Sequence, residues 1–224
     1  MCGRFTRAIS TAAVAEAFGV EEVTGDLKAS YNIAPTNQVA VIVSDGKKRL
    51  IQVRWGLVPS WAKDLAVGNK LINARAETIT EKASFRTAFK KRRCLVVADG
   101  FYEWQKQGDG KRPVYIRLKS GKPFGMAGLY EVWRSPEGED VTSCAIITTQ
   151  ANELMQPIHE RMPVIIPKEI EDLWLDSTVQ DVEVMRNLLK PYPAEEMEAY
   201  PVSKRVNSPG NNSPECIKLL IDEQ

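Results

Sequence analysis

Hydrophobic residues along this chain either alternate with polar ones or form short runs between turn residues, and this pattern predicts many short β-strands. The segments Gln38 to Val43 and Arg49 to Trp55 flank the turn residues Asp45-Gly46, which is typical of a β-hairpin. The same pattern predicts further strands at Arg93 to Ala98, Phe101 to Trp104, Val114 to Leu118, Pro123 to Tyr130, Thr142 to Thr149 and Met197 to Val202.

Helical periodicity is found mainly at the edges of this strand-rich region. Ser10 to Phe18 is rich in alanine and starts with residues that favour the N-cap position. Thr80 to Lys90 is predicted as a helix capped by Thr80, with Phe85, Ala88 and Phe89 on one face. Three more helices are predicted, at Lys168 to Leu175, at Val179 to Leu189 and from Ser213-Pro214-Glu215 onward.

The order of these elements indicates the fold class. Many short strands in hairpin order, with helices at the periphery, predict an α+β protein with a mostly antiparallel, barrel-like sheet. The 224 residues contain no internal repeat, no low-complexity segment and no change in composition that would mark a linker. We therefore expect one domain over residues 1–224.

Charge and cysteine content exclude some classes of function. The formal net charge of +1 excludes a strongly basic protein that coats nucleic acid, although a local basic patch remains open. Neither a C-x-x-C pair nor a Gly-rich phosphate loop occurs, so we expect reduced thiols, no metal and no cofactor. No run of eighteen apolar residues and no signal-peptide pattern occurs, which predicts a cytoplasmic protein without membrane association.

Two ionisable residues are candidates for acid–base chemistry. His159 is the only histidine, and imidazole titrates near neutral pH. Glu103 lies between bulky aromatic residues in "FYEW", where poor solvation would raise the pKa of its carboxyl group. Alternatives are open for both, because His159 fits an ordinary loop histidine and Glu103 fits the solvent-facing position of an alternating strand.

Two further segments contain candidate binding residues. In "NARAE", an extended backbone would place Asn73, Arg75 and Glu77 on one face, where an amide and a guanidinium could hold a sugar and a phosphate. A surface salt-bridge pattern is the alternative. Trp61 follows a proline turn and is the kind of loop aromatic residue that stacks on a nucleobase, whereas Trp55 is expected in the core.

Taken together, the motifs resemble one family. In chain order they are "MCGRF", "YNIAPT", "RWGLVPSWA", "INARAET", "FRTAF", "RRCLVVADGFYEW", "AGLYEVW", "ITTQAN", "IHERMPVI" and "VNSPGNNSPE". This ordered series closely resembles the SRAP (SOS response-associated peptidase) family from Cys2 to about Glu215. The resemblance implies a β-rich core with a positively charged groove, and it implies a protein that senses abasic sites in single-stranded DNA and bonds to them covalently.

The resemblance also implies roles for individual residues. By position, Cys2 matches the residue that crosslinks to DNA, and Glu103 and His159 match the acid–base pair. Asn73 and Arg75 match residues that hold the abasic sugar and nearby phosphates. The remaining residues that fall in blocks resembling DNA-contact segments are Arg4, Trp61, Arg86, Arg161, Ser203 and Asn207.

The chemistry of Cys2 suits this role if Met1 is removed, because the residue then carries an α-amine beside its thiol. An α-amine has a pKa of about 7.7–8.0, so much of it is neutral and nucleophilic at physiological pH. It would attack the aldehyde of the opened sugar to form a Schiff base. The thiol would then close a five-membered thiazolidine ring, an intramolecular step favoured by proximity. The Schiff base also permits β-elimination, so weak lyase activity is expected.

One departure from the family pattern is visible. The family block often reads H-D-R-M-P, whereas residue 160 here is glutamate, which keeps the charge and leaves the match of His159 unchanged. A retained Met1 would block the amine. The other functions considered are an N-terminal-nucleophile cysteine peptidase, with Cys2 as nucleophile and His159 as base, and a non-covalent binding module for single-stranded DNA. We expect a monomer that is associated with the nucleoid if the source is bacterial.

Overall fold

A closed barrel of five strands forms the centre of the computed structural model, which describes residues 2–25 and 27–220. Its strands are hydrogen-bonded in the cyclic order β11, β10, β7, β4 and β5, and Ser143 and Cys144 pair with Arg54 and Trp55 in parallel to close the ring. The barrel strands are β4 (Gln38–Ser44), β5 (Lys48–Trp55), β7 (Arg93–Ala98), β10 (Phe124–Arg134) and β11 (Asp140–Gln150). The α+β class with a mostly antiparallel barrel is thus confirmed.

Four short strands extend the barrel at its edges. β6 pairs in parallel with β11 at Thr148 and its neighbours, and β12 pairs with the same part of β11. β13 pairs with β10, and β2 pairs with β5. Their bounds are β2 (Glu22–Val23), β6 (Asn73–Arg75), β12 (Arg161–Pro163) and β13 (Ile165–Ile166).

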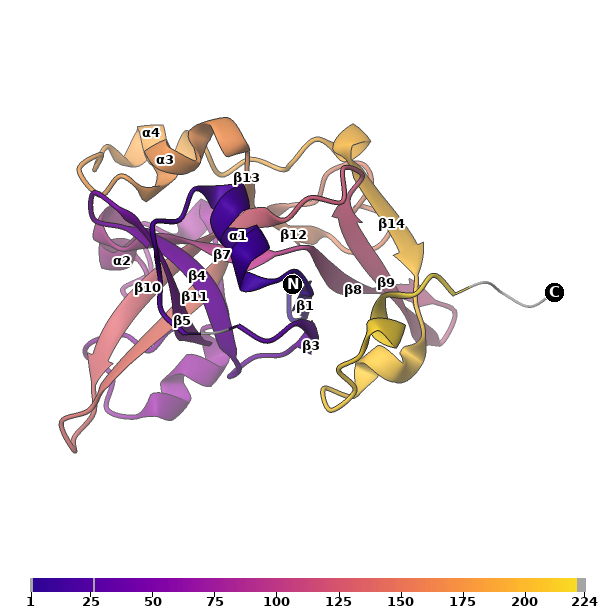
Figure 1. Ribbon diagram of the computed structural model, residues 1–224, viewed down its shortest axis with the longest axis horizontal. Helices are drawn as coiled ribbons and strands as arrows, with labels where there is room; N and C mark the ends of the chain where they lie inside the picture. The colour runs from indigo at the N-terminus through magenta and orange to yellow at the C-terminus, as the bar shows by residue number, and fades with distance from the viewer. Residues whose placement is uncertain (1, 26, 221–224) are drawn as a thin grey trace.

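A second sheet of five strands packs beside the barrel (Figure 1). Its order is β14, β9, β8, β1 and β3, and all of its pairings are antiparallel. The strands are β1 (Phe5–Arg7), β3 (Ser30–Ile33), β8 (Gly100–Gln107), β9 (Gly110–Leu118) and β14 (Met197–Pro201). β1 therefore lies where the second sheet meets the barrel.

Helices cover the outer face of the barrel (Figure 1). The α-helices are α1 (Thr11–Phe18), α2 (Arg86–Lys91), α3 (Glu171–Leu175) and α4 (Val182–Asn187). The 3-10 helices are η1 (Leu65–Lys70), η2 (Ala76–Thr78), η3 (Lys168–Ile170), η4 (Ala194–Glu196), η5 (Lys204–Asn207) and η6 (Pro214–Ile217). Within the described residues, no helix is long and apolar enough to span a bilayer.

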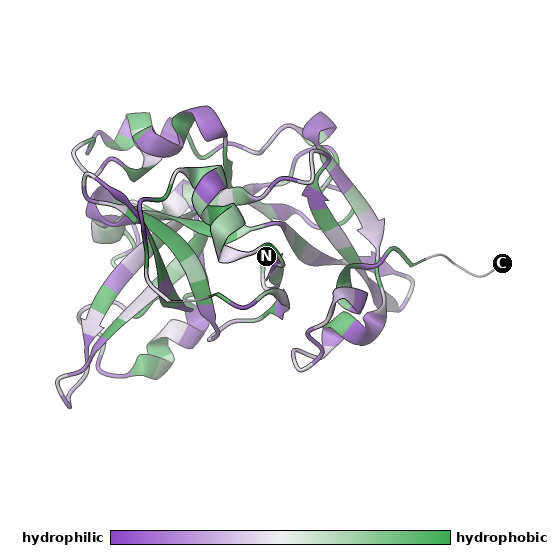
Figure 2. Ribbon diagram, in the orientation of Figure 1, coloured by the Kyte–Doolittle hydropathy of each residue, from purple (hydrophilic) through white to green (hydrophobic). Residues whose placement is uncertain are grey.

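Alternate residues of the barrel strands go to two different cores. Ala40 and Ile42 of β4 pack with α-helical residues such as Phe89 and Trp174, so they face outward. Val39 and Val41 belong to the other cluster, which must fill the barrel interior because β-strand side chains alternate. Both faces are buried, so the barrel strands are almost continuously hydrophobic (Figure 2).

The predicted strands all form, and most run longer than predicted. The prediction of a helix from Thr80 is wrong, because α2 starts only at Arg86 and the preceding residues form separate turns. Ile79 and Phe85 are both buried, and six residues of a regular helix would place them about 240° apart. The broken turns allow both side chains to reach the core. The helix predicted at Val179 to Leu189 is shorter in the structure (Val182–Asn187), and the helix predicted from Ser213 onward is the 3-10 helix η6.

Candidate active site

Cys2 lies three residues before β1 and is fully buried. β1 is held in place by β8 and β9, because Thr6 Oγ1 hydrogen-bonds to the hydroxyl of Tyr115 in β9 (2.8 Å) and donates to the carbonyl of Gly100 in β8 (3.2 Å). Gly100 is required here, since any Cβ at this position would clash with the Tyr115 ring. Contacts within the second sheet thus fix the position of the N-terminal segment.

Asn73 contacts Cys2 from the barrel side. Its Nδ2 donates to the backbone carbonyl of Cys2 at 2.8 Å. Its Oδ1 is buried and has no hydrogen-bond partner among the described residues. A buried amide oxygen without a partner is costly, so this atom is suited to accept a hydrogen bond from a ligand. β6 carries Asn73, and its parallel pairing with Ile146 of β11 sets the direction of the side chain.

Glu103 is buried, with 4% of its surface exposed, which rules out the solvent-facing alternative. It shares a face of β8 with Phe101, and that face packs against the barrel. Burial raises the pKa of its carboxyl group to about 7. Burial also raises the pKa of the Cys2 thiol, and the charge of Glu103 raises it further. The carboxyl and the thiol are therefore close enough to interact electrostatically.

His159 follows a turn that packs onto the same core as Cys2. Met155 in this turn is fully buried in that core, and the carbonyl of Pro157 accepts a hydrogen bond from Gln105 Nε2 at 3.1 Å. Gln105 and Glu103 lie on the same face of β8, so the turn is next to the buried carboxyl.

The ring of His159 has a defined tautomer. The backbone N–H of Arg161 donates to His159 Nδ1 at 3.0 Å, so the neutral ring carries its proton on Nε2. Burial lowers the pKa of the imidazole, which keeps the ring neutral at physiological pH. A neutral imidazole with a proton on Nε2 can act as a hydrogen-bond donor to a ligand oxygen.

Arg161 uses its side chain within the protein. Its guanidinium forms a bidentate ion pair with Glu77, at 2.7 and 3.0 Å, and also donates to Thr148 O at 2.7 Å. Glu77 does not continue the strand formed by Asn73 and Arg75, because the chain turns into η2 at Ala76. Thus the extended "NARAE" segment is predicted correctly for its first half only.

Arg4 is also held by internal contacts. Its Nη1 donates to Asn32 Oδ1 at 2.6 Å and to the carbonyl of Val206 at 2.8 Å, and its guanidinium lies 5.7 Å from the Trp104 ring centroid. Trp104 Nε1 in turn donates to Asn207 Oδ1 at 2.8 Å. The segment that includes Asn207 therefore lies against β1 and β8, close to the start of the chain.

Asn32 is a buried residue that the sequence analysis did not select. Its Nδ2 donates to the carbonyls of Val206, Ser208 and Asn211, at 3.1, 2.9 and 2.7 Å. Asn32 thereby fixes the loop that contains these three residues. The neighbouring Ser203 caps η5 by accepting from the backbone of Arg205. Asn32 lies in the motif "YNIAPT", but a single asparagine in a strand gives no local signal that it will anchor a distant loop.

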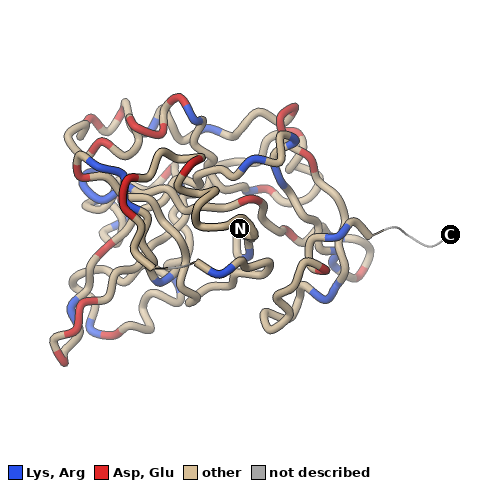
Figure 3. The backbone as a smooth tube through the Cα atoms, in the orientation of Figure 1, with Lys and Arg blue, Asp and Glu red and all other residues tan. Residues whose placement is uncertain are grey.

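The three remaining predicted DNA contacts are exposed. Trp61 has 61% of its surface exposed, and its loop is anchored where Trp133 Nε1 donates to the carbonyl of Ala62 at 2.7 Å. Arg75 ends β6, and Arg86 begins α2. The core position of Trp55 is confirmed. Acidic and basic residues are interspersed along the chain, in keeping with a net charge near zero (Figure 3).

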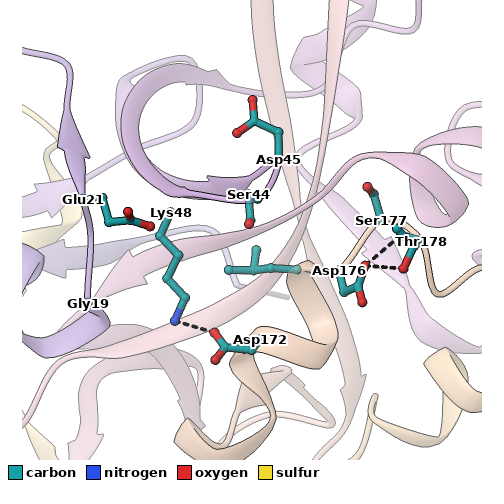
Figure 4. A pocket seen from close by; sticks show the side chains of 11 residues that line it. Gly19, Glu21, Ser44, Asp45, Lys48, Asp172, Asp176, Ser177 and Thr178 are labelled. Atoms are coloured by element: carbon teal, nitrogen blue, oxygen red, sulfur yellow. Dashed lines mark hydrogen bonds and ion pairs between the residues drawn. The ribbon is translucent and has the colours of Figure 1, made fainter.

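A separate cavity of about 840 Å³ lies next to the C-terminal end of α1 (Figure 4). Residues around Gly19, the β4–β5 turn and α3 line it. Lys48 Nζ pairs with Asp172 at 2.5 Å and also donates to the carbonyl of Phe18, which ends α1. The contact with the Phe18 carbonyl caps the end of α1, and the ion pair with Asp172 links β5 to α3. Both contacts are structural. Within the described residues, no set of three His, Cys, Asp or Glu side chains is arranged to hold a metal ion.

The site combines four groups: a buried thiol, an amide with a free oxygen, a carboxyl with a pKa of about 7 and a neutral imidazole. Together these groups can support covalent and acid–base chemistry on a β-barrel. The sequence model of the SOS response associated peptidase (SRAP) family matches residues 1–209. The chain belongs to this family.

Relatives and solved structures agree with this assignment. The chain is 49% identical over 222 residues to the abasic site processing protein YoqW of Bacillus subtilis, covering 97% of this chain and 99% of that protein. It is 36% identical to the abasic site processing protein HMCES of Xenopus tropicalis, covering 86% of this chain and 66% of that protein. A crystal structure from Bacteroides thetaiotaomicron superimposes with a TM-score of 0.89 at 30% identity, covering 98% and 100% of the two chains.

Proposed function

We propose that this protein recognises abasic sites in single-stranded DNA and bonds to them through Cys2 once Met1 has been removed. Met1 lies outside the described residues, so its removal is part of the proposal. The observation that carries the proposal is the cluster of Cys2, Asn73 and Glu103 with the His159 turn beside it. The relatives are named abasic site processing proteins, which supports the same substrate.

The first step forms a Schiff base. The neutral amine of Cys2 attacks the aldehyde carbon, a C–N bond forms, and the carbonyl oxygen leaves as water after accepting two protons. In the second step the thiol adds to the C=N bond, so that sulfur bonds to carbon and its proton goes to nitrogen. The product is a thiazolidine, and no oxidant or reductant is consumed.

Glu103 is suited to move protons in these steps. With a pKa of about 7, its carboxyl group is divided between the protonated and ionised forms near neutral pH. The ionised form can accept a proton from the amine, and the protonated form can deliver one to the departing hydroxyl group. A carboxyl with an ordinary pKa would be almost fully ionised and would be a poor acid.

His159 and Asn73 are suited to assist opening of the abasic sugar and to hold the opened form. The abasic sugar is mostly a closed hemiacetal, so its ring must open before the amine can react. As the hemiacetal opens, the anomeric hydroxyl gives up its proton and the ring oxygen gains one, and the Nε2–H of His159 can hydrogen-bond to the ring oxygen while this proton moves. The Oδ1 of Asn73 can accept a hydrogen bond from the released hydroxyl, while its Nδ2 holds the Cys2 backbone at 2.8 Å.

A preference for single-stranded DNA would come from the exposed residues among the predicted DNA contacts. Trp61 offers an aromatic face to a base, and Arg75 and Arg86 offer charges to phosphates without reading base edges. Arg4, Arg161 and Asn207 are engaged in protein contacts, so they would contribute to DNA binding through the shape of the site or after exchanging partners. Ser203 belongs to the same C-terminal segment.

A cysteine peptidase is the second candidate, because the family name includes that activity. One observation disfavours it. Burial raises the pKa of the Cys2 thiol, whereas peptidases of this type depend on a lowered pKa and a thiolate. Removal of Met1 by the chain itself is the smallest form of this activity, and turnover of unrelated peptides by the mature chain tests the wider form.

Incubation with an abasic oligonucleotide, followed by denaturing electrophoresis and intact mass, tests the proposed function. We expect an adduct whose mass is the sum of the mature protein and DNA minus one water. Cys2→Ala should give at most a reversible imine through its amine, and Cys2→Ser should lose the stable adduct while reversible binding survives. The absence of any adduct with wild-type protein that lacks Met1 would refute crosslinking and leave the non-covalent binding module.

A further inference from the structure

The ion pair between Glu77 and Arg161 connects the two segments that carry the proposed sugar-handling residues. Glu77 follows β6, which carries Asn73, and Arg161 begins β12, directly after the turn that carries His159. The guanidinium binds both carboxylate oxygens, at 2.7 and 3.0 Å. This bidentate geometry is the strongest form of an arginine–carboxylate contact.

The pair spans the barrel strand β11. Thr148 of β11 pairs with Arg75 of β6 on one side and with Pro163 of β12 on the other. Arg161 Nη2 also donates to the Thr148 carbonyl at 2.7 Å and to its Oγ1 at 3.2 Å. β6 and β12 are not hydrogen-bonded to each other, so Glu77 and Arg161 supply a direct link between them.

The environment of the pair favours a fixed geometry. The Arg161 side chain is only 12% exposed, and Thr148 is fully buried. The hydrogen bond from Arg161 lowers the pKa of Glu77, so the carboxylate is ionised throughout the physiological range. The Glu77 side chain is 42% exposed, but the guanidinium that it binds is held by four hydrogen bonds, two to Glu77 and two to Thr148, which limits its motion.

The same residue that forms the pair also orients the imidazole. The backbone N–H of Arg161 donates to His159 Nδ1, so any shift of Arg161 moves the donor that selects the His159 tautomer. We propose that Glu77 is a positioning residue that acts through Arg161 to hold His159 with its proton on Nε2, facing the abasic sugar. The inference rests on the proposed function for its kinetic consequence only, because the tautomer is a property of the free protein.

Because Glu77 is negatively charged, the two possible roles of Arg161 predict opposite effects on crosslinking when Glu77 is removed. If Arg161 served only to bind DNA phosphate, removal of Glu77 would free the guanidinium, remove a negative charge and increase crosslinking. If the pair positions His159, removal of Glu77 leaves DNA binding equal or tighter but slows the reaction of bound DNA. Misplacing a catalytic group by about 1 Å can cost up to roughly 100-fold in rate, so we expect about a 10-fold loss for Glu77→Ala.

Nitrogen NMR of untagged protein labelled with ¹⁵N-histidine tests the structural part. His159 is the only histidine, so its backbone nitrogen and its two ring nitrogens are the only labelled positions, and the ring signals need no assignment to a residue. Wild type should show a protonated Nε2 and an unprotonated Nδ1 in the neutral ring. Glu77→Ala should shift the spectrum toward a mixture of tautomers. An unchanged spectrum would overturn the inference, whether or not the protein crosslinks DNA.

Crosslinking kinetics test the functional part. We expect Glu77→Ala to lower the rate at saturating abasic DNA while the half-saturating concentration stays equal or falls. Glu77→Gln keeps one oxygen acceptor for Arg161, so it should recover part of the rate, and it serves as the second variant if Glu77→Ala folds poorly. Glu198→Ala is the matched control, because it removes the Arg117–Glu198 pair between β9 and β14, at the edge of the second sheet. A faster reaction in Glu77→Ala would overturn the inference, and a wild type without adduct would refute the proposed function alone.

Discussion

Replacing Glu103 by glutamine should change the pH dependence of stability in a way that can be calculated from its burial. Between its ordinary pKa of 4.5 and its folded-state pKa of about 7, the folded protein binds this proton more tightly than the unfolded chain does. The contribution is fully present below pH 4.5 and is lost as the pH rises through about 7. At about 1.4 kcal/mol per pH unit, the loss is about 3 kcal/mol.

Glutamine has nearly the same shape but does not ionise, so Glu103→Gln should not lose this contribution. For a chain of this size, 3 kcal/mol corresponds to a difference of about 6–12 °C in Tm. Thermal unfolding of both proteins at pH 4.5, 6, 7 and 8 measures it. Across this pH range, the Tm of wild type should fall relative to the Tm of Glu103→Gln. The variant should also lose crosslinking activity.

A matched control separates this effect from the substitution itself. Glu137 lies exposed in the turn between β10 and β11, so Glu137→Gln changes the same side chain outside the site. All other titrating groups are shared between wild type and variant and cancel in the difference. If the Tm difference between wild type and Glu103→Gln stays constant from pH 4.5 to 8, the reasoning from burial is refuted.

Three further predictions follow from the site. The crosslinking rate should rise with pH as Glu103 ionises around pH 7 and as the Cys2 amine, with an ordinary pKa of about 7.7–8.0, becomes neutral, while His159 is already neutral; in a rate–pH series Glu103→Gln should remove the part of the rise centred near pH 7. Asn73→Ala should slow crosslinking about 10-fold and cost about 1 kcal/mol of stability in chemical denaturation, because it loses the 2.8 Å hydrogen bond to Cys2. Trp61→Ala should leave Tm unchanged, because the side chain is 61% exposed, but should weaken single-strand binding in a fluorescence titration by about 1–3 kcal/mol; equal affinity would remove Trp61 from the interface.

Local patterns predicted the elements well where local forces decide them. The hairpin of β4 and β5 follows from alternation around Asp45-Gly46, and α1 follows from its cap at Ser10, which accepts from Ala13 N. The start of α2 could not be predicted this way. Burial of Ile79 and Phe85 overrides the helical preference of the residues between them, and burial depends on the core they face.

Long-range pairings gave no signal in the sequence. The barrel closes through parallel contacts between β5 and β11, and β6 joins in parallel at β11, although these strands are about seventy or more residues apart in the chain. Hairpin order explained only the antiparallel neighbours. The position of Asn73 beside Cys2 depends on the β6–β11 pairing, so the site could be proposed from resemblance but not from spacing.

The sequence by itself determined which chemical groups this protein offers: one histidine, a cysteine at position 2, a glutamate in an aromatic strand and an asparagine beside an arginine. It did not determine their pKa values, partners or exposure. Tertiary structure decided that Glu103 is buried with a raised pKa, that His159 carries its proton on Nε2, and that Arg161 faces Glu77. The physical reason is that solvation and hydrogen bonding depend on residues brought together from distant parts of the chain.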